Sequence, residues 1–245
     1  MVIISGGCGG VGSVIGKKLA DDGFEIVALY HKTPRKTAED VVRGFGGRKR
    51  HKAVACDLRD EHAVNAVIDA IVADGGTIDA CIHAAVGPAL RKNILEMSDG
   101  ELREELSVSF FGGFYFLKAA AARMKGKSGA IVGILSRVVE PEVRYARMAG
   151  ITIGKYALRG LLKELHGELL PSPVTVNAIA PDFMDTPLNK DLPSEVRKFI
   201  AERAVRGSIR SPQDVARAVS YLCSDEGRAT NGMIFSFEKN EMHPL

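Results

Sequence analysis

The sequence has no tryptophan, few cysteines and no long hydrophobic run. The cysteines are scattered: Cys8, Cys56, Cys81 and Cys223. With no C-x-x-C pair and no histidine at metal-ligand spacing, we expect reduced thiols and no metal site. No apolar run approaches the ~18 residues of a membrane helix, and residues 1–7 leave no room for a signal peptide. We therefore expect a cytoplasmic protein that does not bind membranes.

Neither sign of charge predominates, because the chain has 33 Lys and Arg and 30 Asp and Glu residues, a net charge of +3. That excess is too small to predict a nucleic-acid partner. What the 245 residues do contain is an alternation of short β-branched runs with longer stretches of helical period. This pattern predicts an α/β fold: one doubly wound Rossmann-like domain over residues 1–245, with a seven-stranded parallel sheet and helices on both faces. Strands are expected near residues 2–5, 25–30, 52–55, 80–83, 130–134, 174–180 and 234–237, and helices near 11–22, 37–45, 61–73, 99–124, 151–170 and 213–224.

A glycine-rich turn, Ser5-Gly6-Gly7-Cys8-Gly9-Gly10-Val11-Gly12, joins the first strand to the first helix. Without Cβ atoms this turn can adopt positive φ and let the backbone approach a pyrophosphate. The N-terminus of the helix directs N–H groups and partial positive charge at that anion. The turn therefore predicts a dinucleotide site.

The second strand is followed by Tyr30-His31-Lys32-Thr33-Pro34-Arg35-Lys36, which has no acidic residue to bind a ribose 2′-hydroxyl. Basic side chains such as His31 and Lys32 suit a 2′-phosphate instead. We therefore expect NADP(H) in preference to NAD(H), the alternative being that these residues form only a solvated turn.

Four motifs together resemble the short-chain dehydrogenase/reductase family over essentially the whole chain: Ser5-x₄-Gly10-x-Gly12, Cys56-Asp57-Leu58, Lys155-Tyr156-Ala157-Leu158-x-Gly160-Leu161 and Val176-Asn177-Ala178-Ile179-Ala180-Pro181. The nearest similarity is to the 3-oxoacyl-carrier-protein reductases, which implies NADPH-dependent reduction. The resemblance implies that Asp57 binds the adenine amino group, Lys155 the nicotinamide ribose, Thr186 the carboxamide and Ser136 the substrate carbonyl. The cofactor residues it implies are Ser5, Gly6, Gly10, Val11, Gly12, His31, Lys32, Asp57, Leu58, Lys155 and Thr186.

The sequence departs from the family at the catalytic tyrosine, which normally stands four residues before the lysine and protonates the substrate oxygen. Ile151 occupies that position, so the general acid, a term worth ~10²–10⁴ in rate, is missing. Asp182 also replaces the glycine of the family's Pro-Gly. The active site is therefore expected to be degenerate while the cofactor half is kept.

Two other residues are candidates for the missing acid. Tyr145 lies in the loop before the Lys155 helix, where Arg144 and Arg147 could lower its pKa or hold an anionic substrate. The alternative is an ordinary loop tyrosine. His83 ends the fourth strand, at the sheet edge that binds ligands, but a histidine there is more often a packed residue bonded to a backbone carbonyl.

These features favour an atypical NADP(H)-dependent reductase of a ketone or 3-oxoacyl-type carbonyl, free or carrier-bound, with Ser136, Lys155 and Tyr145 as catalytic candidates. Water or the substrate itself is an alternative proton source. The main alternative hypothesis is a non-catalytic subunit or cofactor-responsive binding protein that pairs with an active reductase. A third hypothesis is epimerisation or dehydration with the same cofactor.

The family resemblance also implies a homodimer or homotetramer built on the helices near 99–124 and 151–170, or a heteromer with a related reductase. Basic side chains could face an acidic acyl carrier protein, although a solvated rim explains them equally well: Arg123, Lys125, Lys127, Arg144 and Arg147. The long connection over residues 181–207 is typical of a lid.

Overall fold

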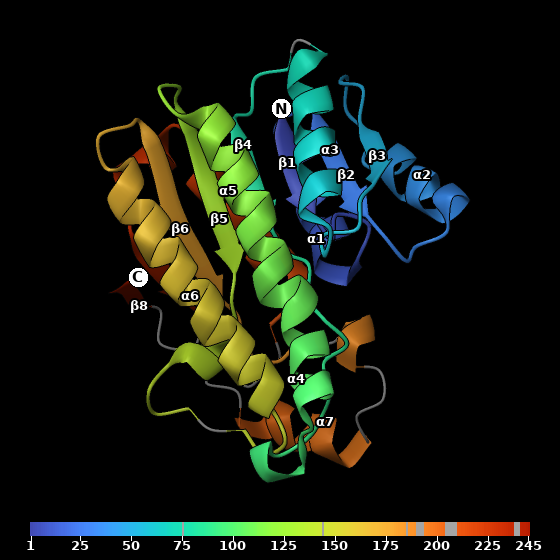
Figure 1. Cartoon of the computed structure of the whole chain (residues 1–245), viewed down its shortest axis with the longest axis vertical. Helices are drawn as coiled ribbons and strands as arrows, with labels where there is room; N and C mark the ends of the chain where they lie inside the picture. Colours follow the sequence, from blue (N-terminus) through green and yellow to red (C-terminus); the bar gives the residue numbers. More distant parts are fainter. Residues whose placement is uncertain (75, 144, 185, 190–193, 204–209, 238–240) are drawn as a thin grey trace.

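All described strands of the chain belong to one sheet in the order β3-β2-β1-β4-β5-β6-β7-β8 (Figure 1). In this computed structural model the described residues are 1–74, 76–143, 145–184, 186–189, 194–203, 210–237 and 241–245. The strands are β1 (Val2–Ser5), β2 (Ile26–Tyr30), β3 (Lys52–Ala55), β4 (Ala80–His83), β5 (Gly129–Ile134), β6 (Val174–Ala180), β7 (Met233–Ser236) and β8 (Glu241–Pro244). From β3 to β7 every pairing is parallel.

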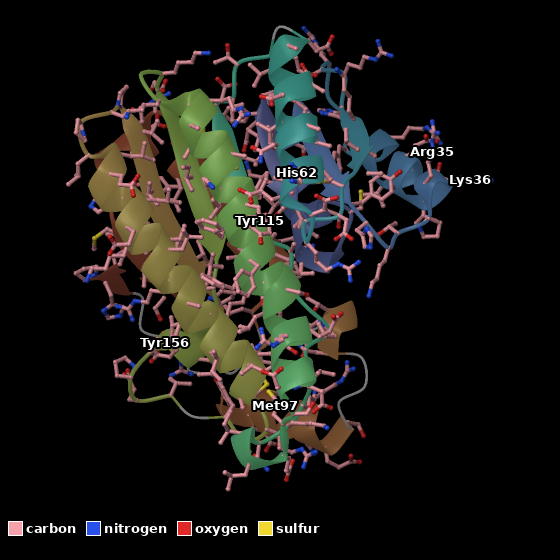
Figure 2. The ribbon with its side chains drawn as sticks, viewed as in Figure 1. Arg35, Lys36, His62, Met97, Tyr115 and Tyr156 are labelled. Atoms are coloured by element: carbon pink, nitrogen blue, oxygen red, sulfur yellow. The ribbon has the colours of Figure 1, made fainter. Side chains whose placement is uncertain are left out.

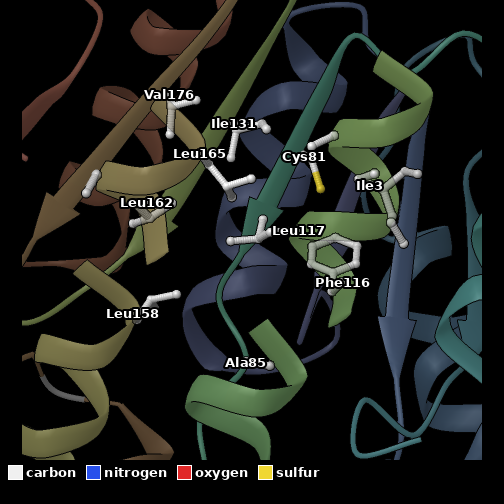
Figure 3. Packing of buried hydrophobic residues seen from close by; sticks show 14 of the residues in the cluster. Ile3, Cys81, Ala85, Phe116, Leu117, Ile131, Leu158, Leu162, Leu165 and Val176 are labelled. Carbon is white, nitrogen blue, oxygen red and sulfur yellow. The ribbon is translucent and has the colours of Figure 1, made fainter. Parts of the chain in front are cut away.

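Helices cover both faces of this sheet, because parallel strands need crossover connections that pack on one face or the other. One face carries α1 (Gly10–Asp21), α2 (Arg35–Arg43) and α8 (Pro212–Cys223). The other carries α3 (Glu61–Ala73), α5 (Gly113–Met124) and α6 (Ala149–Leu169), which lie in front of the strands in Figure 1. Buried side chains such as Ile3, Phe116 and Leu162 fill the layer between them and the sheet (Figure 3).

The predicted α/β fold with its seven parallel strands is confirmed, with boundaries that differ by at most two residues. An eighth strand, β8, adds to the edge antiparallel to β7 and was not expected. It is four residues long, includes a proline and has no repeating apolar pattern, so it carries no strand signal. Helix α7 (Ser194–Arg203) lies within the segment that was expected to be one long connection.

The helix expected over residues 99–124 is interrupted in its middle. It consists of α4 (Asp99–Leu106), a π-helical turn η2 (Ser107–Gly112) and α5. A π turn leaves its backbone offset from the ordinary i→i−4 ladder, and such turns are frequent at functional sites. None of the described helices has the length and apolar composition needed to cross a membrane.

Candidate active site

A cavity of about 870 Å³ opens at the carboxyl ends of the strands. Its walls come from the glycine turn, from the ends of β2 to β6, and from three loops that follow β4, β5 and β6. The strand order reverses at β1 and β4, and the crevice at such a switch point is where doubly wound sheets bind ligands. The fold therefore places one large site where the sequence motifs meet.

The glycine turn forms the floor of this cavity at the N-terminus of α1. Gly6 has φ +68°, and a Cβ there would lie 2.9 Å from Ala85 Cα. A Cβ on Gly12 would lie only 2.2 Å from the Gly6 carbonyl oxygen. Gly9, Gly10 and Val11 line the cavity beside them, and the first turn of α1 has no acidic side chain. The backbone shape and the helix N-terminus together fit a pyrophosphate.

Ser5, by contrast, does not line the cavity. Its hydroxyl is fully buried and lies 2.7 Å from His83 Nδ1. His83 Nε2 lies 3.2 Å from the Ser109 carbonyl oxygen in η2. Because a carbonyl can only accept, Nε2 carries the proton and the Ser5 hydroxyl donates to Nδ1. Burial, and to a smaller extent the charge of Lys155, lowers the pKa of His83 to about 3, so His83 is a packed, neutral residue.

One end of the cavity is lined by residues that follow β2 and β3. His31, Lys32, Asp57 and Arg59 are its polar side chains, and Leu58 lines it beside them. Arg59 donates to Asp57 from Nε at 2.9 Å and from Nη2 at 2.7 Å, which lowers the pKa of that carboxyl to about 2. Arg59 was not singled out from the sequence, although its place two residues after Asp57 could have drawn attention to it.

The other end of the cavity holds Ser136, Ile151 and Lys155. Lys155 is only 6% exposed, and its Nζ donates to the Ile134 carbonyl oxygen at 2.6 Å. Burial lowers the pKa of Lys155 to about 8. Ile151 lies one turn earlier on the same face of α6 and is 8% exposed. At this end an ammonium group therefore stands beside an aliphatic side chain.

Tyr145 reaches the cavity, but its hydroxyl is already engaged. It donates to Asp182 Oδ1 at 2.5 Å, and Arg137 Nη1 donates to Asp182 Oδ2 at 2.8 Å. Burial and the Asp182 carboxylate raise the pKa of Tyr145 well above its usual range. The pKa is raised, not lowered: Arg147 interacts with Glu96 instead, and Arg137 offsets only part of the rise. Arg144 lies outside the described residues, so the expectation about that residue is not tested.

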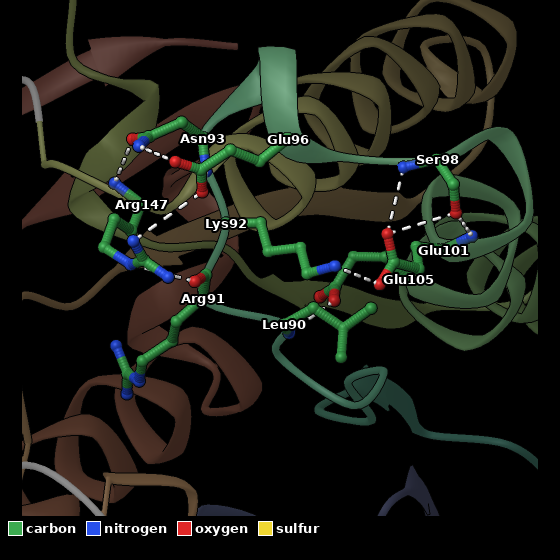
Figure 4. A network of polar contacts seen from close by, with 9 residues as sticks. All are labelled: Leu90, Arg91, Lys92, Asn93, Glu96, Ser98, Glu101, Glu105 and Arg147. Carbon is green, nitrogen blue, oxygen red and sulfur yellow. Dashed lines mark hydrogen bonds and ion pairs between the residues drawn. The ribbon is translucent and has the colours of Figure 1, made fainter.

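The loop after β4 contributes Arg91, which lines the cavity and was not predicted as a site residue. The loop is held by Glu105 of α4, whose fully buried carboxylate accepts from Leu90 N at 2.8 Å (Figure 4). Burial raises the pKa of Glu105. Thr186, from the loop after β6, also lines the cavity and is 9% exposed. Apart from Ser5, every predicted cofactor and catalytic residue thus borders the same space.

Comparison with known proteins agrees with this geometry. The family described as enoyl-(acyl carrier protein) reductase matches residues 7–238. The chain belongs to the short-chain dehydrogenase/reductase family. The chain is thus an oxidoreductase of the short-chain dehydrogenase/reductase type, and this family binds nicotinamide cofactors. In the described residues no group of histidine, cysteine, aspartate and glutamate side chains is arranged to hold a metal.

Similar family members include dehydrogenases and ketoreductases. L-2,3-butanediol dehydrogenase of Corynebacterium glutamicum is 27% identical over 96% of this chain and 95% of its own length. 3-Oxoacyl-(acyl-carrier-protein) reductase FabG of Aquifex aeolicus is 30% identical over 91% of this chain and 89% of its own. A short chain dehydrogenase from Burkholderia cenocepacia, solved in complex with NADP, superposes with a TM-score of 0.87 at 27% identity, covering 97% of this chain and 95% of that one.

Proposed function

We propose that this short-chain dehydrogenase/reductase reduces a carbonyl group with NADPH and without the usual catalytic tyrosine. The observation that carries the proposal is that the glycine turn, Lys155 and Ser136 line one cavity. When bound, a reduced nicotinamide supplies the hydride. The names of the relatives support a ketone or a 3-oxoacyl-type compound as substrate.

The preference for NADP(H) rests on the polar end of the cavity. Lys32 and Arg59 are cations beside the place where an adenosine ribose would follow β2, and His31 lies there as well. The one carboxylate among them, Asp57, is paired with Arg59. Such a cluster favours a 2′-phosphate over a free 2′-hydroxyl.

The roles proposed for the catalytic end are supported by the residues that line the cavity there. Ser136 would donate a hydrogen bond to the substrate carbonyl, Thr186 would bind the carboxamide, and Lys155 would bind the ribose. We also assign the proton to Lys155 rather than to Tyr145. An ammonium with a pKa of about 8 is a competent acid near neutral pH, whereas the Tyr145 proton is held by Asp182.

The pH dependence of turnover tests this assignment. An acid must be protonated to act, so kcat for carbonyl reduction should stay level below a pH of about 8 and fall above it, as Lys155 loses its proton. Lys155→Ala should lose that pH step together with turnover, by about 10²-fold or more. If Lys155→Ala kept turnover and the pH step while Tyr145→Phe lost them, Tyr145 would be the proton donor.

A non-catalytic subunit is the second candidate, and Ile151 is the observation that favours it. A buried isoleucine offers no proton and no hydrogen bond at the position of the family's acid. NADPH binding without turnover of any carbonyl compound, together with co-purification of a related reductase, would support this candidate against the first.

A further inference from the structure

Arg91 is a cation of the cavity that no carboxylate neutralises among the described residues. Its guanidinium is half-buried and lines the space. Its partners are neutral: Nη2 donates to Asn189 Oδ1 at 2.7 Å, and Nη1 to Met148 Sδ at 3.6 Å. A thioether is a weak acceptor, so N–H groups of the guanidinium remain available to a ligand.

Two carboxylates that line the cavity already have counter-ions among the described residues. Asp57 is paired with Arg59, and Asp182 with Arg137. The side chains that Arg91 contacts, Met148 and Asn189, carry no charge. Partial burial of a charge without a counter-ion costs stability unless a ligand supplies the opposite charge. Arg91 thus has the environment of a binding residue, not of a surface cation.

The backbone around Arg91 is strained and firmly held. In the described part of the chain only two non-glycine residues have positive φ: Ala89 at +57° and Arg147 at +58°. Ala89 is two residues before Arg91, and Arg147 Nε donates to the Arg91 carbonyl oxygen at 3.1 Å. Buried Glu105 binds Leu90 N on the other side, as Figure 4 shows. Such strain persists only where the surroundings enforce it, and it concentrates at functional sites.

We infer that Arg91 binds a carboxylate of the substrate, so that the compound reduced is an oxo acid and not a neutral ketone. This inference rests on the proposed reductase function and names its substrate class. A guanidinium binds a carboxylate through two parallel, charge-assisted hydrogen bonds. The apolar wall beside it would contact the carbon chain between the carboxylate and the carbonyl.

The test compares binding of short 2-oxo and 4-oxo acids with binding of their methyl esters, by calorimetry on the protein loaded with NADP⁺, which has no hydride to transfer to them. The acids should bind the wild type more tightly than the esters. Arg91→Gln should weaken acid binding by about ten- to hundredfold, the worth of a charged hydrogen bond, and leave ester binding as it was. Arg91→Lys, which keeps the charge but not the fork, should fall between the two. Arg103→Gln, an exposed arginine paired with Asp99 on α4, is the control and should change neither.

Equal affinity for acids and esters, no binding of any acid, or equal weakening of both by Arg91→Gln would overturn the inference. Because binding needs no turnover, these outcomes are independent of whether the protein reduces anything. The proposed function fails separately, through absence of NADPH oxidation with acids that do bind.

Discussion

Ile151 and Lys155 show how one side chain changes the chemistry open to its neighbour. In the family a tyrosine stands between the lysine and the substrate oxygen. Here Ile151 holds that position, and burial brings the pKa of Lys155 to about 8. The two residues could be predicted from the sequence because their spacing of four on one helix is a local property.

Restoring the tyrosine should therefore raise activity. In Ile151→Tyr the phenol would lie one turn from Lys155, whose charge favours its ionised form, and we expect kcat to rise by about tenfold or more. The matched control is Ile151→Phe, which adds the same ring without the hydroxyl. Both variants enlarge a buried side chain, so both should lose some stability. Identical rates in the two variants would contradict the account of this position.

His83 gives a stability prediction whose sign follows from its lowered pKa. An unfolded histidine titrates near 6.5, while folded His83 stays neutral down to about 3. Stability from this group is complete above pH ~6.5 and is lost as the pH falls toward 3, because the unfolded state binds the extra proton. In His83→Gln, whose amide can satisfy both Ser5 and Ser109, the free energy of unfolding should fall less steeply over this range. NADPH binding should be retained; its loss would mean that His83 has a role in the site.

The contacts of other residues could not be predicted from the sequence, because they join segments that are distant along the chain. Arg91 acquires its environment from Met148 and Asn189, and Tyr145 meets Asp182 only in the folded chain. The same applies to Ser5, whose hydroxyl is occupied by His83 across two strands.

At the scale of elements, the turn between β1 and α1 shows why a short motif was sufficient to predict the local geometry. Its glycines are required by close backbone approaches within the turn itself, as at Gly12, so the spacing carries the geometry. The π turn η2 could not be expected in this way. It follows from packing: the Ser109 carbonyl faces His83, and a Cβ on Gly113 would lie 2.8 Å from the ring of the same residue.

Gly12→Ala tests whether the glycine turn binds the phosphates of the cofactor. The added Cβ would press on the Gly6 carbonyl, displace the turn and weaken NADPH binding by about ten- to hundredfold through lost hydrogen bonds to phosphate. Gly167→Ala is the matched control, because that glycine lies on α6 with nothing near its Cβ position. The control should bind NADPH normally and gain about 1 kcal/mol of stability from helix propensity. Equal affinity in the two variants, measured by nicotinamide fluorescence, would rule out the turn as the phosphate site.

At the scale of the whole molecule, η2 and α6 carry exposed apolar side chains, one of which, Tyr156, is labelled in Figure 2. Phe111 is 44% exposed, Ile153 38% and Tyr156 42%, and α6 packs against η2 where Phe111 lies. We expect this surface to join copies of the chain, in keeping with the dimer or tetramer implied by the family.

Charged substitutions on that surface should break the assembly. A variant with both Ile153→Glu and Tyr156→Glu should have a smaller mass by light scattering than the wild type, because charges are costly in a desolvated interface. Leu170→Glu, at the end of the same helix and 61% exposed, is the control and should leave the mass unchanged. A wild type that is already monomeric would contradict the prediction.

Titration of the purified protein with NADPH and with NADH, followed by the fluorescence of the reduced nicotinamide, tests the central claim most directly because it requires no substrate. The account predicts saturable binding of NADPH and weaker binding of NADH, with a larger difference at low salt than at high salt, since Lys32 and Arg59 would bind the 2′-phosphate through charge. Binding of neither cofactor would contradict the claim that the cavity is a working nicotinamide site, and tighter binding of NADH would contradict the role of these two cations.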